Sequence, residues 1–164
     1  MTIAVGDRLP AATLMTLNAE GAPEPVDAAQ AFAGKTVALF AVPGAYTPTC
    51  SAKHVPSFRQ RQGELKGQGV DAVALTSTND IFVLKAWAKD QGVDGDFMLL
   101  ADGNGDFAKA LGLSVDASKH GLGVRSQRYS MLVKDGVVEQ LNVEENPGAM
   151  EVSDADTLLK QIIG

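Results

Sequence analysis

The sequence predicts an α/β protein in which helices cover both faces of a mixed β-sheet. Apolar runs of strand length alternate with helix-like segments between residues 36 and 111, which is typical of strand–helix–strand units. Around residue 135 an Asp-Gly pair separates two further apolar runs, and this pattern indicates an antiparallel hairpin. A last amphipathic segment at the carboxyl end predicts one more helix.

Length and composition fit one globular domain, residues 1–164. Hydrophobic residues make up 45% of the chain and charged residues 21%, an ordinary balance for a protein with a proper core. The net charge of −6 argues against a nucleic-acid surface. We find no apolar run of membrane-spanning length and no signal peptide. Because a single cysteine makes no internal disulfide, we expect a cytoplasmic protein.

The predicted elements follow the chain in a simple order. Strands are expected where apolar runs are bounded by turn residues, at residues 12–17, 36–41, 70–76, 97–101, 128–134 and 137–143. Helices are expected at residues 27–32, from Thr47 to about Arg61 with a kink at Pro56, at 80–91, at 106–111 and from Ser153 onward. The intervening segments 18–25 and 113–123 are predicted as a turn and as irregular backbone.

Two of these helices carry predicted start signals. Asn79 is expected to cap the helix at 80–91, which Gly92 ends. Ser153, with Asp156 three residues later, resembles a capping box.

The stretch after the second predicted strand carries the chemistry. Prolines and a glycine end the strand, and Thr47-Pro48 has the pattern of a helix start, with Thr47 as N-cap. Cys50, the only cysteine, then lies in the first helical turn. Unpaired backbone N–H groups and the helix dipole favour the thiolate form of a cysteine placed there.

The motif Pro43-x-x-x-Thr47-x-x-Cys50, continued by Ser51 and His54, resembles the active-site motif of peroxiredoxins, most closely the type II (atypical, peroxiredoxin-five-like) subfamily. The resemblance covers essentially the whole chain. It implies a thioredoxin-like fold and an antioxidant peroxidase that reduces hydrogen peroxide and small organic hydroperoxides. Cys50 would attack the peroxide and become a sulfenic acid.

Ionisation of Cys50 alone does not make a fast peroxidase. A free cysteine is already about 7% thiolate at pH 7.4, so full ionisation gains only about 14-fold. Hydrogen-bond donors must therefore stabilise the charge that moves to the departing oxygen. Thr47 is one candidate donor, although a plain N-cap is the simpler interpretation, and Pro43 is expected to wall the pocket.

An arginine is the expected charge partner of Cys50, because a guanidinium keeps its proton and offers several donors. Arg125 and Arg128 are both candidates. The family motif has an arginine just before an aromatic residue at a strand start, and Arg128-Tyr129 matches it, so Arg128 is preferred.

Three further residues are expected around the substrate pocket. His54 lies four residues after Cys50 on the same helix face, where it would act as a base or as a hydrogen-bonding wall. Gly44 would allow a close turn. Tyr46 stands where the family often has phenylalanine, and its hydroxyl would add a polar group near the pocket. His120 is interpreted as a loop residue.

The resemblance also implies partners. Some relatives carry a second, resolving cysteine, which this chain lacks, so an outside thiol must reduce oxidised Cys50. Glutathione with glutaredoxin, or thioredoxin, would supply that thiol, and the family usually forms homodimers. No cofactor or metal is expected: Cys50 and His54 lack the further cysteines and histidines of a structural zinc site.

Two other functions use the same thiol. The first is a peroxide sensor or binding module that is not an enzyme, in which oxidation of Cys50 would alter the interaction with a partner. A cysteine hydrolase using His54 or His120 is a weaker hypothesis, because the sequence shows no oriented Cys–His–Asn/Asp set.

Overall fold

The computed structural model describes residues 2–146 and 148–164. The strands are β1 (Thr13–Leu17), β2 (Pro23–Asp27), β3 (Thr36–Val42), β4 (Ala72–Ser77), β5 (Met98–Ala101), β6 (Ser114–Asp116), β7 (Val124–Ser126), β8 (Tyr129–Lys134) and β9 (Val137–Val143). The helices are α1 (Ala28–Ala31), η1 (Cys50–His54), α2 (Val55–Gly67), α3 (Ile81–Asp90), α4 (Asp106–Leu111), η2 (Ser118–His120) and α5 (Ala155–Ile163).

Seven strands form one mixed sheet in the order β2-β1-β5-β4-β3-β8-β9. Strand β3 lies inside the sheet, parallel to β4 on one side and antiparallel to β8 on the other. All but the first of its residues are buried, which explains why its sequence is continuously apolar. The hairpin β8–β9 turns at Asp135 and Gly136, both with positive φ, as the Asp-Gly signal predicts.

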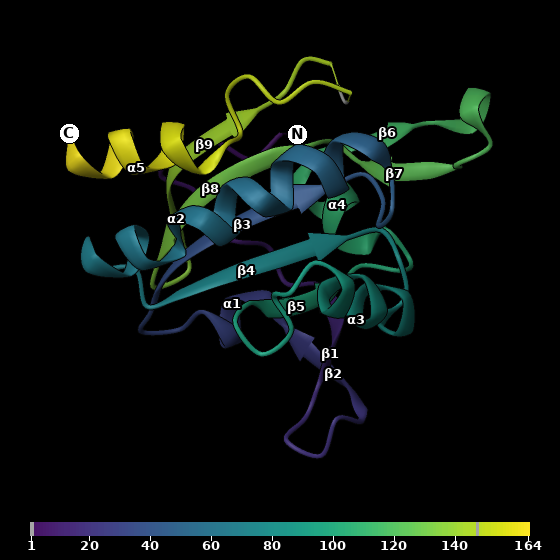
Figure 1. The fold of residues 1–164 in the computed structure, drawn as a ribbon, viewed down its shortest axis with the longest axis horizontal. Helices are drawn as coiled ribbons and strands as arrows, with labels where there is room; N and C mark the ends of the chain where they lie inside the picture. The colour runs from purple at the N-terminus through teal and green to yellow at the C-terminus, as the bar shows by residue number, and fades with distance from the viewer. Residues whose placement is uncertain (1, 147) are drawn as a thin grey trace.

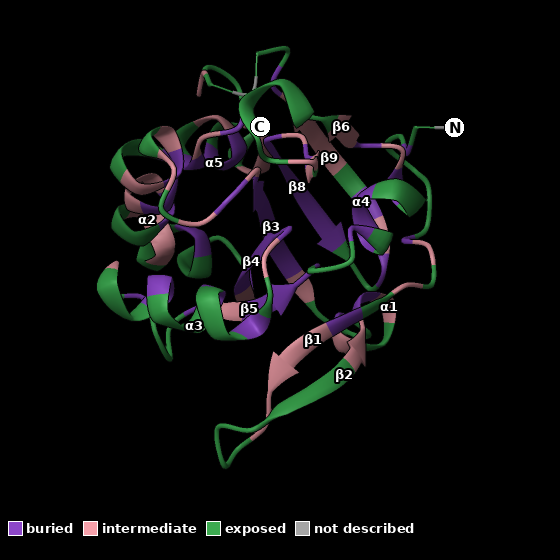
Figure 2. Cartoon of the chain, turned by 90° about the vertical axis from the view of Figure 1, so that its right-hand side faces the viewer, coloured by how far each residue is buried: buried purple, intermediate pink, exposed green. Residues whose placement is uncertain are grey.

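Helices cover both faces of the sheet, as predicted (Figure 1). One hydrophobic core joins β3 and β4 to helices α2, α3 and α5. The second core, on the opposite face, includes residues of α1 and α4. Figure 2 shows buried strands between these two helical layers, with the more exposed hairpin β1–β2 at one edge.

Several predicted boundaries differ from the structure. Residues 23–25, the end of the predicted turn, and Asp27, the predicted first residue of a helix, belong to the edge strand β2. Proline is tolerated there because one side of the strand needs no partner. Segment 113–123 is not simply irregular: β6 pairs with β7 in a separate ribbon, which projects from the end of the molecule where β4 ends (Figure 1). Helix α2 continues beyond Arg61 to Gly67.

Both predicted helix caps are off by one residue. Asp80 caps α3 through its bond with the Val83 N–H, and Asp154 caps α5 through the Thr157 N–H. The side chains of Asn79 and Ser153 make tertiary contacts instead, and both contacts support the site described below.

Candidate active site

The predicted turn from strand to helix places Cys50 at the end of β3. The helix begins at Pro48, and the Ser51 N–H donates to the Thr47 carbonyl at 3.0 Å, so the helix start predicted at Thr47-Pro48 is confirmed. From Cys50 to His54 the turns widen into a π-helix, and the Val55 N–H donates to the Cys50 carbonyl. The predicted distortion near Pro56 thus takes the form of a wide turn, which relieves the clash of a proline ring with the preceding turn.

Contacts from neighbouring loops hold the turn that carries Cys50. The Ala45 N–H donates to Asn79 Oδ1 at 2.8 Å, and the Thr78 hydroxyl donates to the Pro43 carbonyl at 2.9 Å. Arg125 Nη1 lies 3.4 Å from that carbonyl and 3.2 Å from the Thr78 carbonyl. Arg125, the second candidate for the charge partner, therefore connects two loops and does not contact the sulfur.

Two donors converge on the sulfur of Cys50, which is completely buried. Arg128 Nη2 lies 3.1 Å from Sγ, and Thr47 Oγ1 lies 2.7 Å from it. The same hydroxyl lies 2.7 Å from the Gly44 carbonyl. Because a hydroxyl has one hydrogen, it donates to only one of these two acceptors at a time, and donation to Sγ leaves the Gly44 carbonyl without it.

His54 is buried behind Arg128, outside the pocket wall where it was expected. Its Nδ1 lies 3.0 Å from Arg128 Nη1, and its Nε2 lies 2.9 Å from the Ser153 carbonyl. An arginine only donates, so Nδ1 is the acceptor and Nε2 carries the hydrogen. Burial, reinforced by the Arg128 charge, lowers the pKa of His54 to about 3. A neutral ring with both nitrogens engaged does not serve as a general base, which also weakens the hydrolase hypothesis.

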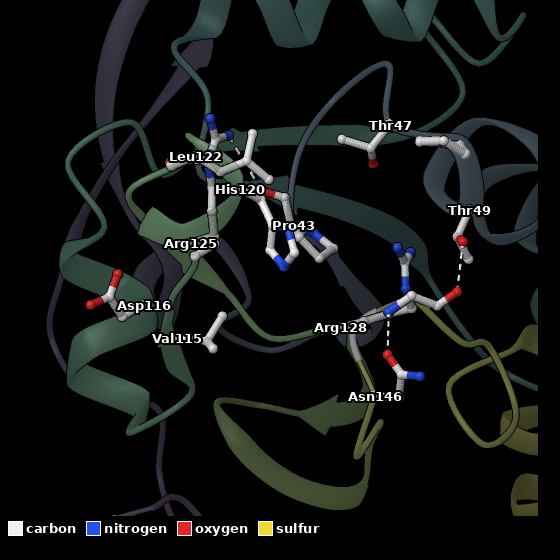
Figure 3. Close-up of a pocket in the computed structure, with 13 residues that line it drawn as sticks. Pro43, Thr47, Thr49, Val115, Asp116, His120, Leu122, Arg125, Arg128 and Asn146 are labelled. Atoms are coloured by element: carbon white, nitrogen blue, oxygen red, sulfur yellow. Dashed lines mark hydrogen bonds between the residues drawn. The ribbon is translucent and has the colours of Figure 1, made fainter.

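A pocket of about 480 Å³ is lined in part by Thr47 and Arg128, the two side chains that contact the buried sulfur. Figure 3 shows Thr47, Thr49 and Arg128 on one side and Val115, Leu122 and Arg125 on the other. The lining residues come from the segment after β3, from the β6–β7 ribbon, from the residues between β7 and β8, and from the loop before α5: Pro43, Thr47, Pro48, Thr49, Val115, Asp116, Ala117, His120, Leu122, Arg125, Arg128, Asn146 and Gly148. Thr47 and Arg128 thus link the pocket to Sγ.

The other predicted pocket residues take different places. Pro43 lines the pocket, as expected of a wall. At Gly44 a Cβ atom would lie 3.2 Å from Arg125 Nη1 and 3.3 Å from Thr47 Cγ2, so a side chain there would require one of these neighbours to shift. Tyr46 has a positive φ, and its hydroxyl donates to Asp90 at 2.6 Å on the molecular surface, not in the pocket. Its left-handed backbone turns the ring toward α3, where it lies near Trp87.

Sequence reasoning missed the wall formed by the β6–β7 ribbon. His120, interpreted as a loop residue, lies in this wall together with Val115 and Leu122. Only two β-branched residues, Val115 and Val124, signalled a ribbon, and the glycines between them concealed it.

Within residues 2–146 and 148–164, no three His, Cys, Asp or Glu side chains are grouped as metal ligands. The helices in the same ranges are all too short or too polar to span a bilayer.

Comparison with known proteins agrees with this geometry. The chain matches the Redoxin family model over residues 4–159. It is 51% identical to the chloroplastic peroxiredoxin-2E-2 of Oryza sativa subsp. japonica, covering 98% of this chain and 73% of the relative. It is 49% identical to the chloroplastic peroxiredoxin-2E of Arabidopsis thaliana, covering 98% and 70%. Reduced Prx3 of Vibrio vulnificus, solved in complex with H2O2, superposes with a TM-score of 0.92 at 48% identity, covering 98% and 99% of the two chains.

These likenesses extend over nearly the whole chain and confirm the predicted thioredoxin-like fold. The buried thiol between a hydroxyl and a guanidinium is the chemistry that the motif predicts. The chain therefore belongs to the redoxin family as a type II peroxiredoxin with one cysteine, and it is a thiol-dependent peroxidase.

Proposed function

We propose that Cys50 is the peroxidatic nucleophile and that Thr47 and Arg128 are its catalytic partners. The observation that carries this proposal is their position: both contact Sγ, and both line the pocket from which a peroxide enters. The thiolate attacks one peroxide oxygen, the O–O bond breaks, and the second oxygen leaves with its electron pair. After protonation it is water or an alcohol, and Cys50 is a sulfenic acid.

Arg128 and Thr47 lower the part of the activation barrier that ionisation of Cys50 does not change. As the O–O bond breaks, negative charge moves from the sulfur to the departing oxygen. Arg128 and Thr47 present N–H and O–H groups at the edge of the pocket where that charge develops, and preorganised donors stabilise such charge without reorganising. Pro43 completes the wall on this side of the pocket.

The size of the pocket supports organic as well as hydrogen peroxides. A liquid water occupies about 30 Å³, so a cavity of about 480 Å³ is much larger than hydrogen peroxide requires. Val115 and Leu122, across from Arg128, offer an apolar surface for an alkyl group. We therefore include small organic hydroperoxides among the substrates.

Reduction of the sulfenic acid requires a thiol from another molecule, because Cys50 is the only cysteine. That thiol displaces water and forms a mixed disulfide with Cys50, and a second thiol then releases the enzyme. Glutathione with glutaredoxin, or thioredoxin, is the proposed donor. Since this chemistry consumes reduced thiols, we place the protein in the cytoplasm, and fractionation of the native cells tests that location.

We further propose that the protein is a homodimer. Four exposed apolar side chains come from loops and elements next to the site: Tyr46, Phe82, Leu122 and Val124. Phe82 stands at the start of α3, and Leu122 and Val124 belong to the β6–β7 ribbon. Sedimentation of the protein and of a Phe82→Glu variant tests the assembly, and a monomer at all concentrations would contradict it.

Stopped-flow oxidation of fully reduced protein tests the proposed chemistry. Trp87, the single tryptophan, donates to the Ser51 hydroxyl at 3.0 Å, so its fluorescence is a direct signal next to Cys50. We expect a fast stoichiometric burst with hydrogen peroxide, a sulfenic or sulfinic acid at Cys50 by mass spectrometry, and no burst in Cys50→Ser. Repeated turnover with added thiol separates the enzyme from a sensor, which reacts only once.

A further inference from the structure

Glu144 is a buried carboxylate that the proposed chemistry does not use. It follows β9 and is 3% exposed. One of its oxygens, Oε2, accepts from the N–H groups of Glu151, Val152 and Ser153 at 2.7–2.9 Å. The Ser153 hydroxyl also donates to it at 2.7 Å. Glu144 thus fixes the segment that leads into α5.

These hydrogen bonds keep the carboxylate charged. Burial by itself would raise the pKa of Glu144, but the bonds from the Ser153 hydroxyl and from three backbone N–H groups outweigh it and leave the pKa below its usual value. A charged acceptor makes stronger hydrogen bonds than a neutral one, so the position of Ser153 is closely defined.

A series of contacts connects the segment that Glu144 fixes to the sulfur of Cys50. The Ser153 carbonyl accepts from His54 Nε2, His54 Nδ1 accepts from Arg128 Nη1, and Arg128 Nη2 contacts Cys50 Sγ. We propose that Glu144 is a positioning residue that orients the Arg128 guanidinium through Ser153 and His54. This inference rests on the role proposed above for Arg128.

A second contact ties the same two residues together. The Glu144 N–H donates to the Arg128 carbonyl at 2.9 Å, so Glu144 borders Arg128 through the backbone as well. The contacts through Ser153 and His54 are the ones that orient the Arg128 guanidinium. If Ser153 moves, the His54 ring loses the acceptor that fixes its rotation. The guanidinium then loses its contact with His54 Nδ1, which helps to aim it at Sγ.

The test measures the second-order rate of Cys50 oxidation by hydrogen peroxide, read from Trp87 fluorescence, together with the melting temperature. Glu144→Ala removes the acceptor and is expected to lower the rate by about 10- to 100-fold, as misplacement of a reacting group does. Glu144→Gln keeps an acceptor oxygen and should recover most of the rate. Glu144→Asp keeps the charge on a shorter side chain, and it replaces the alanine variant if that variant does not fold. We expect its loss of oxidation rate to lie between those of Glu144→Gln and Glu144→Ala.

Asp154→Ala is the matched control, because it removes the α5 cap one residue after Ser153 without touching the bonds to Glu144. It should lower the melting temperature and leave the rate within about twofold, since a cap contributes about 1 kcal/mol to stability. Equal rate losses in Asp154→Ala and Glu144→Ala would overturn the proposal and reduce Glu144 to a structural role.

A double-mutant cycle tests the route through His54. If Glu144 acts through His54, adding Glu144→Ala to His54→Leu costs less than about twofold in rate, because the connection is already broken. Additive losses overturn the proposal. Arg128→Lys is measured in the same series: full activity there would overturn the role of Arg128 itself. A slow Arg128→Lys beside fast Glu144→Ala and Glu144→Asp would overturn only the inference about Glu144.

Discussion

His54 and Arg128 form a buried pair in which the histidine is the acceptor. Nδ1 of His54 lies 3.0 Å from Arg128 Nη1, and the opposite ring nitrogen is engaged by the Ser153 carbonyl. A protonated imidazole would place a hydrogen on Nδ1 facing a guanidinium that also only donates. The folded protein therefore requires His54 to stay neutral, and Arg128 is the only cation of the pair.

The first prediction is a loss of stability at acid pH caused by His54. Its pKa falls from about 6.5 in the unfolded chain to about 3 in the folded protein. Below pH 6.5 the unfolded chain takes up a proton that the folded chain does not, so stability falls as the pH drops from 6.5 toward 3. Between pH 7.5 and pH 5 the loss should be about 2 kcal/mol, measurable by urea unfolding.

Two variants check that this loss belongs to His54. His54→Gln retains one acceptor and one donor but does not titrate. The difference between its free energies of unfolding at pH 7.5 and pH 5 should therefore be about 2 kcal/mol smaller than in the unchanged protein. His120→Gln, the same change at the exposed histidine, should leave the dependence on pH intact. An unchanged pH dependence in His54→Gln would show that other groups cause it.

Arg128→Lys separates the effect of the positive charge from the effect of the hydrogen-bond geometry of the guanidinium. The lysine keeps a cation near the sulfur, but one ammonium does not reproduce the two contacts that Arg128 makes with Cys50 and His54. We expect the rate of Cys50 oxidation to fall well beyond the ~14-fold that ionisation of the thiol can account for at pH 7.4. A smaller loss at that pH would mean that Arg128 contributes only its charge.

Thr47 gives a prediction with a matched pair. Thr47→Val removes the hydroxyl that lies 2.7 Å from Sγ and from the Gly44 carbonyl, with little change in shape. The rate should fall by about 100-fold or more, as it does when one preorganised donor is lost. Thr47→Ser keeps the hydroxyl and should retain most of the rate. If Thr47→Val reduces only the melting temperature, the residue is a helix cap and nothing more.

The sequence predicted the parts of the fold that local patterns control. The apolar run of β3, the Thr47-Pro48 helix start and the Asp135-Gly136 turn all appear as expected. Arg128 also has the predicted contact with the sulfur, although its preference over Arg125 came from the family motif and not from spacing.

The errors lie where tertiary contacts compete with local preference. Asn79 and Ser153 are good N-caps by residue type, but the next residue caps each helix. Asn79 instead holds Ala45 in the catalytic turn, and Ser153 binds Glu144. A single sequence does not show these partners, because they are 34 residues away and 9 residues away along the chain. The pocket wall formed by the β6–β7 ribbon was missed for a different reason: its strands are short, and glycines lie between them.

The last prediction concerns Gly44, because the side chains of Arg125 and Thr47 both lie close to the position that a Cβ atom would take there. A methyl group there would lie 3.2 Å from Arg125 Nη1 and 3.3 Å from Thr47 Cγ2. Either Arg125, which contacts the Pro43 and Thr78 carbonyls, or Thr47, which contacts Cys50, would have to shift by a few tenths of an ångström. We expect Gly44→Ala to lower stability by about 1–3 kcal/mol, as overpacking does, and to slow peroxide reduction.

Gly63→Ala is the control for that change. Gly63 lies in α2, and a methyl group there meets no atom within 4 Å. Alanine favours a helix by up to about 1 kcal/mol over glycine, so this variant should be slightly more stable and equally fast. If Gly44→Ala destabilises the protein but leaves the oxidation rate unchanged, Arg125 has yielded and Thr47 has not. A loss of rate larger than the loss of stability explains would show that the hydroxyl of Thr47 has been displaced from the sulfur.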